Sequence, residues 1–67
     1  MSKVVKVIEV LAQSDKSWED AAQSAITEAS KSVRNIKSIW IQEKSAKVTD
    51  NKISKYRITA KISFVID

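Results

Sequence analysis

The 67-residue sequence contains no cysteine, histidine, glycine or proline. Without cysteine there are no disulfides, and without cysteine and histidine the usual ligands of a structural zinc ion are missing. The lack of glycine excludes a glycine-rich phosphate loop and a dinucleotide-binding fingerprint, and the lack of proline excludes a proline-rich linker. A chain of this size buries only about 60% of its unfolded surface and usually needs a staple or a partner. We therefore expect one domain, residues 1–67, that self-associates.

Several function classes are disfavoured as well. No apolar run approaches the roughly 20 residues of a membrane span, and no signal peptide opens the chain, so we expect a cytoplasmic protein with no membrane partner. Histidine and cysteine, the commonest general base and the best nucleophile, are absent, so we expect no enzyme. The net charge of +4 is spread along the chain, which argues against a nucleic-acid partner.

The first half of the sequence predicts a strand followed by a helix. Residues Lys3–Ala12 are rich in valine and isoleucine on both faces, which is typical of a strand covered on both sides. After a polar connection at 13–16, Ser17 and Asp20 resemble a capping box that starts a helix. A mostly alanine stripe follows at helical spacing: Trp18, Ala21, Ala22, Ala25, Ile26, Ala29, Val33 and Ile36. Lys31 and Arg34 are then expected near the helix end, with Asn35 as a left-handed cap.

From Ile36 onward the period changes to two, which predicts strands. Asp50 and Asn51 both tolerate positive φ and predict a tight turn, and Tyr56–Ile66 alternates regularly. The resulting register pairs Ile39 with Ile62 and Ile41 with Ala60 on the core face, and it pairs Trp40 with Lys61, Gln42 with Thr59 and Lys44 with Arg57 on the outer face. The fold class is α+β, a β-α-β-β chain whose three-stranded antiparallel sheet wraps around one helix.

Two features of the outer face leave alternatives open. Lys44 and Arg57 are like charges placed opposite each other: they share an anion, they splay apart in water, or a bulge shifts the register. Trp40 points outward and should meet either a partner chain or a planar ligand. Trp18, by contrast, lies on the core stripe and is expected to be structural.

Three segments carry a resemblance to a known family. The opening KVVKVIEVLAQSDKSWEDA, the run A-x3-A-x3-V-R-N-I and the closing KYRITAKISF together resemble the dodecins over nearly the whole chain. The resemblance implies a hollow homododecamer that binds flavins without catalysis. The flavins would be stored as stacked pairs between aromatic residues of neighbouring subunits. Such storage would protect the flavin from photochemistry and buffer its free concentration. Some members of the family bind coenzyme A.

The sequence departs from the family at two positions. Ser38 stands where many flavin-binding members carry a tryptophan, and Arg57 stands where they carry a glutamine. The predicted ligand-binding residues are therefore Trp40 as a displaced stacking platform, with Arg57, Gln42 and Ser38 as polar partners. Arg57 would contact a flavin carbonyl, a phosphate or a carboxylate. For flavin mononucleotide (FMN), Lys44 or Lys47 would contact the phosphate.

The alternative is a structural or ion-binding assembly that has lost flavin binding. Its motivation is that Ser38 and Arg57 occupy the two positions where the family's flavin contacts are expected. The oxygen donors available to a symmetry-axis metal site are Glu9, Glu43, Asp50 and Asp67. Their spacing resembles no calcium-binding loop.

Overall fold

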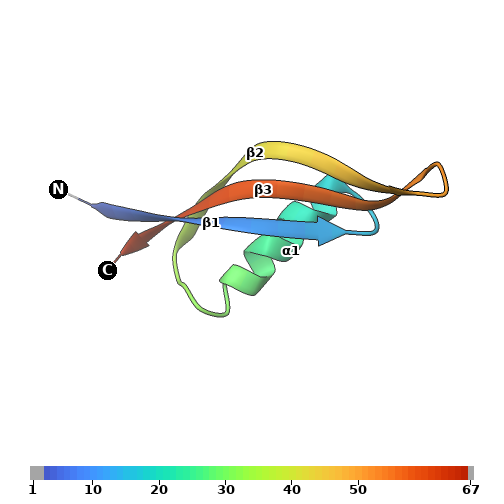
Figure 1. Ribbon diagram of the computed structural model, residues 1–67. Helices are drawn as coiled ribbons and strands as arrows, with labels where there is room; N and C mark the ends of the chain where they lie inside the picture. Colours follow the sequence, from blue (N-terminus) through green and yellow to red (C-terminus); the bar gives the residue numbers. More distant parts are fainter. Residues whose placement is uncertain (1–2, 67) are drawn as a thin grey trace.

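The computed structural model describes residues 3–66 as three strands and one helix. The elements are β1 (Val4–Ser14), α1 (Trp18–Ala29), β2 (Ile36–Thr49) and β3 (Lys52–Ile66). β3 is the central strand and pairs antiparallel with both β1 and β2. The helix crosses one face of the sheet (Figure 1). The β-α-β-β order and the antiparallel sheet are thus as predicted.

A short chain of hydrogen bonds fixes the connection from β1 to α1. The backbone N–H of Asp20 donates to Ser17 Oγ (2.9 Å), which is the predicted cap. The Asp20 carboxylate accepts from Ser14 Oγ (2.6 Å), and Ser14 Oγ in turn accepts from the backbone N–H of Lys16 (2.9 Å). β1 runs two residues further than predicted because Gln13 and Ser14 still pair with β3.

The helix is shorter than predicted. It ends at Ala29, so Lys31 and Arg34 lie beyond its last turn. Ser30 Oγ donates to the Thr27 carbonyl (2.7 Å), a side-chain bond that competes with continued helix. Asn35 has the predicted positive φ of 60°, but it precedes β2 and does not cap the helix.

The β2–β3 hairpin is longer than the rest of the sheet. Asp50 and Asn51 form the predicted two-residue loop, with φ of 52° and 63°. β1 stops opposite Tyr56, whereas the hairpin continues past both β1 and α1 (Figure 1). We call residues 47–55 the arm; it lies at one end of a chain whose longest extent is 54 Å. β3 consequently begins at Lys52, four residues before the predicted start.

The core is small and covers one face of the sheet. Its buried apolar residues are Ala21, Ala22, Ala25, Ile58, Ala60 and Ile62. The alanines let the helix approach β3 closely, and Ile58 and Ile62 are the largest fully buried side chains in the described part of the chain. We call the opposite face the open face, because α1, the one helix among residues 3–66, does not lie over it. Leu11 there is 82% exposed, and Val5, Val7 and Trp40 are also exposed.

Trp18 and Trp40 provide a test of this two-sided architecture. Trp18 packs edge-on against Tyr56 (ring centroids 4.8 Å apart), and its Nε1 donates to the Ser45 carbonyl (2.9 Å). We expect Trp18→Ala to lower the free energy of unfolding by about 3 kcal/mol, because a packed indole is lost. Trp40→Ala should cost clearly less. Urea unfolding at equal protomer concentration measures both; equal losses would show that Trp40 belongs to the core.

Candidate functional site

The open face is organised in rows across the sheet. Each outward residue of β3 lies between one residue of β1 and, where β2 reaches, one of β2. The rows are Gln13–Arg57–Ser45, Leu11–Thr59–Glu43, Glu9–Lys61–Trp40, Val7–Ser63–Ser38 and Val5–Val65. Successive rows are about 7 Å apart, since a strand rises roughly 3.3 Å per residue. The open face thus presents acids, cations and one aromatic ring in a fixed order.

Trp40 is the large aromatic side chain of this face. It is 63% exposed and lies opposite Lys61, as the sequence register predicts. The Lys61 Nζ atom lies over the indole, 5.7 Å from the ring centroid, which is cation–π distance. On the other side of Lys61 the register places Glu9, yet no ion pair joins the two. The ammonium group therefore rests on the ring of Trp40.

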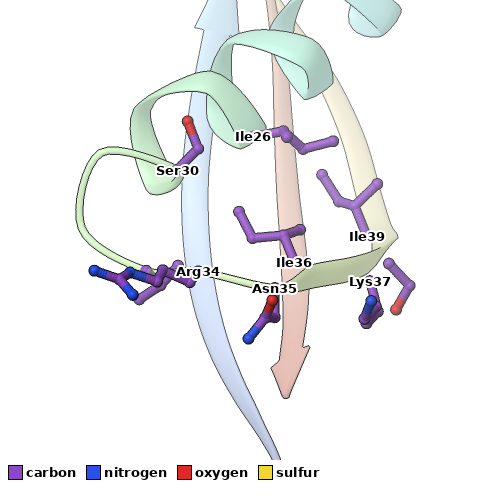
Figure 2. A pocket seen from close by; sticks show the side chains of 9 residues that line it. Ile26, Ser30, Arg34, Asn35, Ile36, Lys37 and Ile39 are labelled. Atoms are coloured by element: carbon purple, nitrogen blue, oxygen red, sulfur yellow. The ribbon is translucent and has the colours of Figure 1, made fainter. Parts of the chain in front are cut away.

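Ser38 lies one row from Trp40. Its hydroxyl is hydrogen-bonded to the hydroxyl of Ser63 across the strand pair. It also lines a pocket of about 550 Å³ beyond the end of α1. Figure 2 shows Ile26, Ile36 and Ile39 close together in this pocket, whereas Arg34 extends away from them. The pocket thus lies between the helix end and β2 with a cluster of isoleucines inside it and polar residues around them, and Ser38 already has a polar partner.

Arg57 is also on the open face, but far from Trp40. Its Nε donates to Gln13 Oε1 on β1 (3.2 Å), and it lines a depression of about 450 Å³ together with Leu11 and Ser45. Arg57 is four residues from Lys61 along β3, which is about 13 Å at 3.3 Å per residue. Within one chain, Arg57 and Trp40 thus form two separate positions.

The predicted places of Gln42 and Lys44 are wrong. A bulge between Ile41 and Glu43 leaves Gln42 as the extra residue, so Glu43 opposes Thr59 and Lys44 opposes Ile58. Lys44 consequently lies on the helix side, where its Nζ is 5.8 Å from the ring centroid of Trp18. The expected pair of Lys44 with Arg57 does not exist. Of the three alternatives, the bulge is the one that the structure has.

The remaining predicted partners do not gather around Trp40. Lys47 lies on the arm opposite Lys55, and Asp50 is in the turn at its tip. Glu9 and Glu43 share the open face but lie on the two outer strands, about 10 Å apart across the sheet and one row, about 7 Å, apart along it. Asp67 lies outside the described residues. Within residues 3–66, no three acidic side chains come close enough to hold a metal ion.

Sequence reasoning did not count Lys61 among the site residues. The register had already paired it with Trp40, and that pairing was the available signal.

Within the described range, α1 is too short to cross a membrane and no other helix could do so. What the open face offers is an exposed indole with a cation on it, and a separate guanidinium two rows away.

Comparison with known protein families gives a match to the family described as Dodecin over residues 4–67. The chain belongs to the dodecin family. Comparison with curated protein sequences finds no match.

Solved structures agree with this assignment. A dodecin from Thermus thermophilus superimposes with a TM-score of 0.93 at 23% identity, over 98% of both chains. A dodecin from Streptomyces coelicolor gives 0.92 at 20% identity, over 97% of this chain and 93% of that one. These two share the fold. A dodecin from Mycobacterium tuberculosis, described as a calcium-chelating antigen with a calcium-binding site, is 37% identical with a TM-score of 0.82, over 96% and 91% of the two chains.

The position of Lys44 leads to a direct prediction. Because Lys44 contacts Trp18 on the helix side, Lys44→Met should alter the fluorescence of Trp18 and leave the affinity for a ligand on the open face unchanged. Tryptophan emission is measured in a Trp40→Phe background, so that only Trp18 reports, and ligand affinity is titrated in the protein that keeps Trp40. If Lys44→Met instead lowered the ligand affinity by about tenfold or more, Lys44 would have to contribute to ligand binding and the prediction would be wrong.

Proposed function

We propose that this dodecin binds and stores a flavin without catalysis, as a homododecamer. The observation that carries the proposal is the exposed indole of Trp40, which lies on the sheet face opposite the helix. An aromatic ring this exposed is a stacking surface for a planar ligand or for another subunit. The family resemblance favours the flavin, whose isoalloxazine supplies the broad aromatic surface that stacks.

The residues of this chain fit such a ligand in part. Trp40 offers the stacking face, and Ser38 and Lys61 offer hydroxyl and ammonium groups in the neighbouring positions. Arg57 is too far along the same chain, so we infer that it reaches the ligand of a neighbouring subunit. There it would donate to a carbonyl or to an anionic group. Coenzyme A, with its planar adenine and its phosphates, is the alternative ligand of the same chemistry.

Self-association is supported by the apolar side chains that the single chain leaves in water. Leu11, Val5 and Val7 are exposed on the open face, and Val48 and Ile53 are exposed on the arm. Burying such surface stabilises an assembly by about 25 cal/mol per Å². We expect sedimentation equilibrium at micromolar concentration to give the mass of twelve chains. A mass near the 7.5 kDa of one chain would contradict the proposed assembly.

Flavin binding is tested by quenching of flavin fluorescence. The native protein should quench riboflavin or FMN at micromolar concentration. Trp40→Ala should weaken binding by about tenfold or more, because stacking on one aromatic ring contributes about 1–3 kcal/mol. Trp18→Phe, which keeps an aromatic ring in the core, serves as the control and should bind like the native protein. The absence of quenching by the native protein would reject flavin storage.

Calcium is the second candidate, favoured by the 37% identical relative from M. tuberculosis. Glu9 and Glu43 are exposed carboxylates on the open face, but a calcium ion needs six to eight oxygen ligands. Several subunits would have to contribute them. Isothermal titration with calcium decides: if the ion binds, the double variant Glu9→Gln, Glu43→Gln should abolish binding, while Glu19→Gln on the helix should not.

A further inference from the structure

Lys61 occupies the centre of the row that contains Trp40. Its two cross-strand neighbours are Glu9 on β1 and Trp40 on β2. The ammonium group lies over the indole and makes no ion pair with Glu9. The cation is therefore held at the aromatic surface by a weak contact, beside the place where a stacked ligand would lie.

An exposed cation–π contact is weaker than a charge-assisted hydrogen bond to a phosphate or a carboxylate. A ligand that brings such an oxyanion next to the indole would draw Lys61 away from the ring. A neutral planar ligand offers the ammonium nothing comparable, and it must either use the opposite face of the indole or displace the cation. The cost of displacing Lys61 thus differs between the two kinds of ligand.

We propose that Lys61 is a specificity residue, which makes the Trp40 platform prefer planar ligands that carry an attached phosphate or carboxylate. This inference rests on the proposed function, since it presupposes a ligand stacked on Trp40. The other cations are less suited to the task. Arg57 lies about 13 Å along the strand and donates to Gln13, and Lys44 is on the helix side.

The test compares riboflavin with FMN, which differ by one phosphate. Affinities are measured by fluorescence quenching for the native protein and for Lys61→Met, which keeps the length of the side chain and removes its charge. The native protein should favour FMN by about tenfold, the scale of one charge-assisted contact. Lys61→Met should bind both flavins nearly equally, with its riboflavin affinity unchanged or raised.

Two control variants separate this role from general effects of charge and folding. Lys52→Met removes the same charge at the tip of the arm and should keep the native preference for FMN. Lys61→Arg keeps the charge and should also keep the preference, even if Lys61→Met proves poorly folded. Loss of the preference in Lys52→Met, or in a folded Lys61→Arg, would contradict the proposal.

Inorganic phosphate distinguishes an attached oxyanion from a free one. Added phosphate should compete for Lys61 and reduce the advantage of FMN over riboflavin. If it instead raises the affinity of the native protein for riboflavin, the oxyanion need not be attached and the proposal is overturned.

An equal FMN preference in the native protein and Lys61→Met rejects the role of Lys61 alone. Failure of the native protein to bind either flavin rejects the proposed function itself.

Discussion

The close packing of a short, alanine-lined helix on one face of the sheet is the contact on which the rest of the structure depends. Ala21, Ala22 and Ala25 lie against a sheet whose large buried side chains are Ile58 and Ile62. A helix of 12 residues covers only the middle of that face. The other face and the arm keep apolar side chains exposed, so the same packing that folds the chain leaves it with surfaces typical of interaction sites.

Much of this arrangement follows from sequence periodicity, and the failures have physical reasons. Alternation placed Ile39 and Ile41 toward the core and Trp40 away from it, because apolar residues there fix the phase of the strand. The polar run from Gln42 to Ser45 contains no apolar residue, so nothing in it determines which side faces the helix. The structure has a bulge at that point, and the segment just after it accepts a tertiary hydrogen bond from Trp18 at the Ser45 carbonyl. The helix was overestimated for the opposite reason, since Val33 and Ile36 continue the apolar period past its end.

For the candidate site, the sequence predicts which side of the sheet each residue faces, but not how far apart the residues lie. The sequence identified Trp40, Ser38 and Arg57 as open-face residues, and the structure puts them there. It also separates Arg57 from Trp40 by two rows. This separation depends on the strand register, and knowing which residues share a face does not give it. Gln42 and Lys44 were assigned to the site because a regular strand was assumed. The sequence register pairs Lys61 with Trp40, but only the structure shows that its ammonium group lies over the indole.

The departure from the family pattern at position 38 changes which side chains surround the aromatic ring of this face. The resemblance implies an aromatic ring at position 38, whereas here the ring is at position 40, one row closer to Arg57. That shift of about 7 Å brings the indole level with Lys61, so the ring and a cation now share a row. At position 57 a cation replaces the expected neutral amide. Lys61 is the cation in the row of Trp40, Arg57 lies two rows away, and Glu9 and Glu43 lie in the same row and in the next row, respectively. A neutral ligand gains little from such a surface, whereas an oxyanion gains a charge-assisted contact. The displaced tryptophan thus places the aromatic ring beside a cation, and the preference proposed above for a ligand with an attached oxyanion follows from that neighbour.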